Sequence, residues 1–141
     1  MKVVIQRAAR ARSSPGGAIR SGLVVLLGIA EGDDEAGIRR LAGKTARLRI
    51  FPDDAGRFDR SLLDTGGEAL VVSQFTLIAD TAKGNRPSFS DAARPETAEL
   101  LYEAFCDELR KLGVEVATGV FGAHMQVELV NDGPVTIVLD A

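Results

Sequence analysis

The sequence has few of the residues on which metal binding, disulfide formation and redox chemistry depend. Its 141 residues include one cysteine, Cys106, one histidine, His124, and no tryptophan. A lone cysteine excludes an internal disulfide and is typical of a reducing compartment, so we expect a cytoplasmic location. One histidine and one cysteine are too few for a structural zinc site, and no loop has the alternating ligand spacing of a calcium site. We expect no metal and no other cofactor.

Long apolar segments are missing too. The longest, Gly22 to Ala30, is far shorter than the roughly 20 residues of a membrane-spanning helix. The N-terminus returns to charge after three apolar residues, which argues against a signal peptide and against membrane association. The contents of 45% hydrophobic and 26% charged residues are ordinary for a globular protein. A chain of this length can bury a proper core, so we expect one domain over residues 1–141.

An excess of positive charge is absent as well. The formal net charge is −3, which argues against non-specific nucleic-acid binding, because that binding rests on the neutralisation of phosphates. A local basic surface remains compatible with this value. Five basic residues lie between positions 39 and 49, and the solvated face of a helix explains them more simply than contact with nucleic acid does: Arg39, Arg40, Lys44, Arg47 and Arg49.

The pattern of apolar residues predicts more strands than helices. One helix is expected after an N-cap in Gly32-Asp33-Asp34, and a second from Pro95 to Gly113. Residues 8–20 are poorly patterned, and residues 61–67 have the composition of a loop. The prediction is an α+β domain with a sheet-rich, barrel-like or sandwich core and two packed helices. Strands are predicted over residues 2–7, 23–29, 50–51, 68–75, 114–117, 125–130 and 135–139.

Polar side chains gather at the end of the strand predicted over residues 68–75. Ser73, Gln74 and Thr76 supply two hydroxyls and an amide, with no acid or base among them. Strand ends that lead into loops are places where a rigid sheet presents groups to a ligand. The set indicates positioning by hydrogen bonds more than proton transfer by side chains. Taken alone, it is explained better by hydroxyls that satisfy neighbouring backbone groups.

A second informative segment is Asn131-Asp132-Gly133-Pro134-Val135-Thr136. By itself it predicts a β-hairpin turn. Glycine before proline is nevertheless unusual, because Gly133 can take conformations that the pre-proline clash denies to other residues. Pro134 also makes a cis peptide accessible. Such a turn can aim two carbonyl oxygens outward as rigid acceptors.

The residues that occur only once do not indicate nucleophilic catalysis. Cys106 lies beside the apolar stripe of the second predicted helix, so we expect it to pack in the core. His124 stands at the start of a strand, and nothing in the sequence pairs it with Ser73 or with a particular acid. We interpret it as a surface or strand-edge histidine.

The segments Ser73-Gln74-Phe75-Thr76-Leu77 and Asn131 to Thr136 together resemble the two signature motifs of the D-aminoacyl-tRNA deacylases. We identify the chain on this resemblance as a member of that family. The resemblance implies the deacylase fold and a homodimer with its active sites along the subunit interface. Further matches follow in the same order almost from end to end, at residues 5–7, 22–23, 27–28, 49–51, 86–89 and 125–127.

In this family each site accepts the aminoacylated 3′ end of a tRNA and hydrolyses the ester bond to a D-amino acid or to glycine, without a cofactor. The resemblance implies that Gly133-Pro134 is a cis dipeptide that enters the pocket of the partner subunit. Its two carbonyl oxygens would receive the α-amino group of the substrate, and Arg7 would hold the dipeptide in place. An L side chain would then point into this rigid wall, which rejects the common substrate.

The resemblance also assigns roles around the first motif. An aminoacyl ester is already activated, so orientation and main-chain hydrogen bonds can supply most of the catalysis. In the mechanism that the resemblance implies, the ribose 2′-OH of the tRNA assists the attacking water. We prefer this route to a Thr76 nucleophile, because no base is present to activate the threonine hydroxyl. The implied catalytic residues are Ser73, Gln74, Thr76 and the backbone of Phe89; the implied substrate-binding residues are Phe75, Ser88, and Phe121 and Met125 beside the terminal adenine.

The sequence departs from the family pattern in three places. Residues 8–20 are several residues shorter and lack the usual alternating hairpin, so we expect the first strands to be trimmed or loop-like. Val120 stands where many relatives have a basic residue, and His124 where an acid is common. Both positions flank the implied adenine pocket.

Two other functions stay open. A non-catalytic dimeric module would bind tRNA ends or nucleotides on the same scaffold and would differ only in lacking turnover. A serine hydrolase acting on small esters through Ser73 and His124 requires His124→Ala to abolish activity. The deacylase interpretation expects only a modest effect of that substitution.

Overall fold

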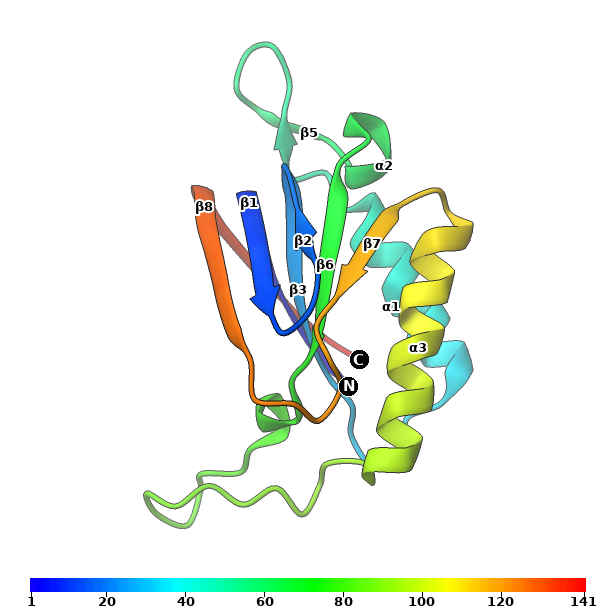
Figure 1. Ribbon diagram of the computed structural model, residues 1–141, viewed down its shortest axis with the longest axis vertical. Helices are drawn as coiled ribbons and strands as arrows, with labels where there is room; N and C mark the ends of the chain where they lie inside the picture. Colours follow the sequence, from blue (N-terminus) through cyan, green and yellow to red (C-terminus); the bar gives the residue numbers. More distant parts are fainter.

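The computed structural model describes residues 1–141 and is built on one twisted, mixed sheet (Figure 1). Its strand order is β2-β1-β3-β6-β7. Strands β3 and β2 follow one another along one edge of β1, and β8 pairs along the opposite edge. Strands β3, β6 and β7 are parallel, whereas β1 is antiparallel to its three neighbours. The strands of this sheet are β1 (Lys2–Ser14), β2 (Ala18–Ile19), β3 (Gly22–Gly28), β6 (Glu68–Ser73), β7 (Glu115–Thr118) and β8 (Gln126–Asp140). A separate two-stranded sheet consists of β4 (Phe51–Pro52) and β5 (Phe58–Arg60).

Two long helices, α1 (Glu35–Arg47) and α3 (Pro95–Lys111), pack against each other and cover one face of the sheet (Figure 1). Helix α1 begins where the sequence predicts, because the Asp34 carboxylate accepts a hydrogen bond of 2.8 Å from the backbone N–H of Gly37. Helix α3 begins with Pro95, as predicted. Proline lacks a backbone N–H, and no hydrogen bond is lost at the first helical position because a donor there would have no intrahelical acceptor. None of the helices is long and apolar enough to cross a membrane.

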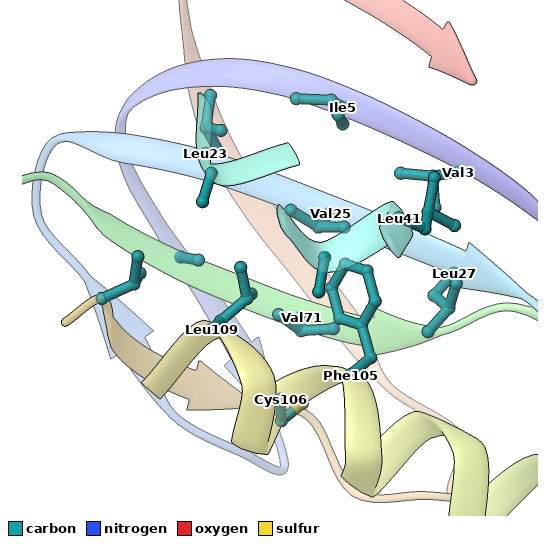
Figure 2. Close-up of a cluster of buried hydrophobic side chains, with 14 of the residues drawn as sticks. Val3, Ile5, Leu23, Val25, Leu27, Leu41, Val71, Phe105, Cys106 and Leu109 are labelled. Atoms are coloured by element: carbon teal, nitrogen blue, oxygen red, sulfur yellow. The ribbon is translucent and has the colours of Figure 1, made fainter. Parts of the chain in front are cut away.

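The main hydrophobic core lies between the sheet and the two long helices. Figure 2 shows side chains of β1, β3 and β6 meeting those of α1 and α3, among them Val25, Val71, Leu41 and Phe105. Cys106 is part of this core, and burial raises the pKa of its thiol to about 11. The prediction that this cysteine packs in the core is confirmed.

A smaller apolar cluster lies on the opposite face of the sheet. It contains Val24, Leu70 and Val72, which alternate along β3 and β6 with residues of the main core. The sheet curls so that β8 covers this face with Val127 and Leu129. Strands β3 and β6 are therefore buried on both faces, which explains why each is a continuous apolar run. The near-closed mixed sheet with its packed helices confirms the predicted α+β class.

The expectation that the first strands are trimmed or loop-like is wrong for β1, whereas β2 is short, with only two residues. Strand β1 continues to Ser14 and forms a hairpin with β2, in which Ala11 lies opposite Ile19. The alternation of this strand is carried by small side chains, since Ala8, Ala11 and Ser13 are buried. Alanine and serine contribute little to a hydrophobicity pattern, so the sequence does not reveal the strand.

The interpretation of residues 131–134 as a hairpin turn is also wrong. Both flanking segments pair with the same strand, β1: Asn131 lies opposite Ala8, and Thr136 lies opposite Gln6. In a hairpin, the two flanking segments would pair with each other. The motif is instead a large bulge within one continuous strand, β8, in which residues 132–135 lie opposite Arg7 alone.

Two shorter segments also differ from the prediction. Residues 61–67 contain a one-turn helix, α2 (Leu62–Thr65), which is capped by two reciprocal hydrogen bonds of 2.8 and 3.1 Å between Ser61 and Asp64. The strand predicted to reach Phe75 ends at Ser73, and a short 3₁₀ helix, η1 (Phe75–Ile78), follows.

Leu109 and Leu100 provide a matched test of the core, because both are leucines of α3 and they are 0% and 68% exposed. Leu109→Ala should lower the free energy of unfolding by about 2–5 kcal/mol, since it removes buried methyl groups and leaves a cavity. Leu100→Ala should change it by less than about 0.5 kcal/mol. Urea denaturation measures both values, and equal losses would contradict this packing.

Candidate active site

The end of β6 opens into a pocket of about 680 Å³. Strand β6 contributes Val72 and Ser73, and the chain just beyond it contributes Gln74 and Phe75. The other walls come from the segment before α3, from the start of α3, and from the segment between β7 and β8. In Figure 1 these segments lie at the lower end of the sheet, where β3 and β6 both terminate. Segments far apart in the sequence thus share one pocket.

The exit from β6 is held by hydrogen bonds to β3 and by a close backbone approach. Gln74 donates its backbone N–H to the carbonyl oxygen of Leu27 at 2.8 Å. A Cβ atom at Gly28 would lie 2.8 Å from the Leu77 Cβ and 3.0 Å from the Gln74 carbonyl oxygen, so only glycine permits this packing. The Gln74 side-chain amide donates to the Thr76 hydroxyl. The polar end of the strand is therefore fixed in place.

Phe89 reaches the same pocket from the long segment that follows η1. Its ring meets that of Phe75 edge to face, with the centroids 5.1 Å apart. The segment folds back because Asp80 and Ser88 exchange two backbone hydrogen bonds of 2.8 and 2.9 Å. The backbone N–H of Phe89 donates to no acceptor within the chain. This N–H is available to a ligand.

The segment between β7 and β8 forms another wall of the pocket. The Met125 sulfur accepts a hydrogen bond of 3.3 Å from the backbone N–H of Val120. The Phe121 ring packs on Tyr102 of α3, with centroids 6.0 Å apart. The Tyr102 hydroxyl donates to the Val71 carbonyl oxygen at 2.8 Å, and burial raises the pKa of this tyrosine. Tyr102 therefore stays neutral and ties α3 to β6 beside the pocket.

Arg7 and Gly133-Pro134 form a separate group. Arg7 is only 8% exposed, and its guanidinium donates to the carbonyl oxygens of Asp132 at 2.9 Å and Ile50 at 2.6 Å. The Gly133-Pro134 peptide bond is cis, Gly133 has a φ of +134°, and both residues are exposed. Arg7 thus holds the backbone directly before the dipeptide.

The pocket and this second group do not meet within one chain. Val127 is the last residue of β8 that lines the pocket. Asn131, where the bulge begins, lies four residues further along the strand, which corresponds to about 13 Å. The dipeptide beyond Asn131 does not line the pocket of its own chain.

The structure brings together part of the predicted site. Thr76 and Ser88 are exposed and do not line the pocket. Arg94 also lines the pocket, and nothing in the sequence marks it as a site residue except its position before Pro95. The predicted residues that line the pocket are Ser73, Gln74, Phe75, Phe89, Phe121 and Met125.

The chemistry available in the pocket is hydrogen bonding rather than acid–base catalysis. No aspartate or glutamate lines it, and its ionisable side chains are Arg94 and His124. Ser73 and His124 share the pocket, but no hydrogen bond joins them and no acid orients the histidine. A Ser-His-Asp arrangement requires both features. The pocket offers a hydroxyl, an amide and a free backbone N–H instead.

Comparison with known proteins identifies the family. The sequence profile described as D-Tyr-tRNA(Tyr) deacylase matches residues 4–140. The chain belongs to the D-Tyr-tRNA(Tyr) deacylase family. The D-aminoacyl-tRNA deacylase of Roseiflexus sp. (strain RS-1) is 63% identical over 100% of this chain and 94% of its own length. The D-aminoacyl-tRNA deacylase of Deinococcus radiodurans is 54% identical over 99% of each chain.

Solved structures agree with the deacylase fold. A structure described as c-Myc DNA Unwinding Element Binding Protein has a TM-score of 0.92 and 42% identity, and the match covers 100% of this chain and 99% of that one. A probable eukaryotic D-amino acid tRNA deacylase has a TM-score of 0.86 at 18% identity over 99% and 98% of the two chains. The family predicted from the two motifs is confirmed, and the chain is a hydrolase of the deacylase class.

Arg7→Lys tests how this deacylase holds its β8 bulge. Lysine carries a compact charge on one nitrogen and cannot reproduce the arginine fork that binds the carbonyl oxygens of Asp132 and Ile50. We expect the free energy of unfolding to fall by about 1–3 kcal/mol. Arg10→Lys, at an exposed position of the same strand, should change it by less than about 0.5 kcal/mol. Thermal or urea unfolding compares the two, and an unchanged Arg7→Lys value would show that the fork does not stabilise the bulge.

Proposed function

We propose that the chain hydrolyses the ester bond of D-aminoacyl-tRNA, and also that of mischarged glycyl-tRNA, and releases the free amino acid and the tRNA. Family membership supports this function. The observation that carries it is the exit of β6, where Ser73, Gln74 and the free N–H of Phe89 border one pocket without an acidic side chain. The proposal includes residues 1–141 acting as one domain and a cytoplasmic location, where aminoacyl-tRNA is made and used.

The proposed reaction relies on orientation. Water attacks the carbonyl carbon of the ester, and the bond between that carbon and the ribose oxygen breaks. The Phe89 N–H donates to the carbonyl oxygen as negative charge develops there. Ser73 and Gln74 hold the ester, and the ribose 2′-OH of the substrate assists the water. Thr76 is a poor candidate for the nucleophile, because its hydroxyl is exposed and no base contacts it.

The proposal also includes a homodimer that completes each site. Strand β8 has 15 residues and pairs only with β1, so its other edge offers unpaired backbone groups to a second chain. Val130 and Val138 on this strand are 40% and 57% exposed. Gly133-Pro134 is exposed and lies apart from the pocket of its own chain. It enters the partner's pocket instead, where its two carbonyl oxygens receive the α-amino group of the substrate.

Selection against L-aminoacyl esters follows from the same arrangement. With the α-amino group and the ester both held, the side chain of an L-amino acid points at the Gly133-Pro134 backbone. This backbone cannot swing aside, because the nearly buried Arg7 binds the preceding carbonyl oxygen of Asp132. Rejection of the common substrate by a fixed wall is a form of specificity that requires no additional contact to the D-amino acid.

Ester loss from three substrates tests the proposed function. Purified protein should hydrolyse D-tyrosyl-tRNA and glycyl-tRNA rapidly and leave L-tyrosyl-tRNA intact. A chelator should have no effect, because no cluster of three or more metal-ligating side chains is present. A D-tyrosyl ester that stays as stable as it is in buffer would refute the hydrolase.

Gly133→Ala tests the cross-subunit wall. A Cβ atom at Gly133 would lie 3.0 Å from both the backbone nitrogen and Cγ2 of Val135 and 3.3 Å from the Arg7 guanidinium, and its φ of +134° strains any L residue. We expect the rate on the D ester to fall by about 10- to 100-fold, with a smaller preference for D over L. Gly113→Ala is the control, because Gly113 also has a positive φ but no neighbour within 4 Å of the added Cβ. Unchanged rate and chirality in Gly133→Ala would rule out the wall.

A non-catalytic module that binds tRNA ends or nucleotides is the second candidate. One solved relative with 42% identity is described as a DNA unwinding element binding protein, so nucleic-acid binding has a precedent on this fold. Such a module needs the same pocket, and only turnover separates the two functions. Stable D-tyrosyl-tRNA that nevertheless binds to the protein would favour the module.

A further inference from the structure

The one permanently charged side chain that lines the pocket, Arg94, is positive. Arg94 and His124 are its ionisable side chains, and no carboxylate borders it, although acidic residues outnumber basic ones by 20 to 17 in the whole chain. Most of the remaining lining is apolar and includes the Phe121 ring and Met125. A pocket of this kind suits a ligand that joins a flat, weakly polar ring to a negatively charged group.

The Arg94 guanidinium is free to meet such a ligand. The backbone of Arg94 is fixed, because its carbonyl oxygen accepts a hydrogen bond of 2.8 Å from Ala98 at the start of α3. Its side chain makes no capping hydrogen bond to the helix. It takes part in none of the nine salt bridges of the chain. A cation on a rigid wall, without an internal partner, is poised for an external anion.

We propose that Arg94 binds the phosphate that joins the last two nucleotides of the tRNA, with His124 as a second hydrogen-bond donor. The inference rests on the proposed function, in which the ester of the terminal nucleoside lies at the exit of β6. It places the base of that nucleoside against Phe121 and Met125, which line the same pocket and which the family resemblance assigns to the terminal adenine. The ester is on the 3′ side of the ribose and the phosphate is on the 5′ carbon. A nucleoside held in this way turns its phosphate toward a different part of the pocket wall.

The arginine fork matches two phosphate oxygens with two parallel, charge-assisted hydrogen bonds. Arg94 thereby fixes the terminal nucleoside and acts as a positioning residue, without contact to the reacting ester. Lys83 and Arg86 are exposed in the segment between η1 and α3, but they do not line the pocket. They are free to meet phosphates further along the RNA, so a single nucleotide isolates the effect of Arg94.

Binding of adenosine 5′-monophosphate and of adenosine measures this one phosphate, because the two ligands differ in nothing else. In NMR titrations of the full chain, the wild-type protein should bind the nucleotide about tenfold more tightly than the nucleoside. Arg94→Ala should reduce this preference to about twofold or less and leave the affinity for adenosine unchanged. Arg94→Lys should keep part of the preference, since it retains the charge and loses the fork. Lys111→Ala removes one charge at the far end of α3 and should keep all of it.

Deacylation of D-tyrosyl-tRNA by the same variants separates positioning from chemistry. Arg94→Ala should raise KM about tenfold and leave kcat unchanged, because the lost contact is present before and during the reaction. Equal binding of the nucleotide and the nucleoside by the wild-type protein would overturn the proposal, and so would an undiminished preference in Arg94→Ala. A preference that disappears in Arg94→Ala, in a protein that hydrolyses no D ester, would support the phosphate site and refute the proposed function.

Discussion

The burial of β6 on both of its faces decides where the chain leaves the sheet. Leu70 and Val71 are fully buried on opposite sides of this strand, which pairs in parallel with β3 and with β7. In the observed register Ser73 lies opposite Leu27. A shift by one residue would turn every side chain of β6 to the opposite face, where it would not fit the close-packed neighbours of that side. The polar groups that follow the strand therefore emerge at one defined point.

A second constraint acts through Arg7. Its guanidinium is nearly buried and binds the carbonyl oxygens of Asp132 and Ile50, so it joins β1, the bulge in β8 and the chain before β4. A charge in such a place is stable only when its donors are satisfied. The bonds that satisfy Arg7 also stiffen the backbone beside the exposed Gly133-Pro134 dipeptide. Rigid backbone that projects away from its own pocket is suited to act on a second molecule.

No carboxylate lines the pocket, and no acid orients its one histidine, His124, which restricts the acid–base chemistry that the site can support. An activated ester needs less from the protein than an amide or a phosphate ester does, since orientation and a few fixed donors suffice. The same lack of carboxylates leaves Arg94 without a competing anion. The features that make the site weak as a general acid–base catalyst make it suitable for an RNA end that carries its own negative charge and its own hydroxyl.

Local sequence patterns predicted those elements of the protein that depend on residues close together in the chain. The helix starts at Asp34 and Pro95, the buried strand β3 and the two family motifs follow from periodicity, capping and residue order. The hairpin of residues 8–20 was decided by the pairing of β1 with β2 and β8, because the buried side chains of β1 in this part are alanine and serine. The bulge at Asn131 was decided by the pairing of β8 with β1. The place of Arg94 in the pocket was likewise decided by tertiary structure, because its neighbours there come from three distant segments. Neither strand partners nor pocket walls are encoded in a local pattern, since both depend on contacts between residues far apart in the chain.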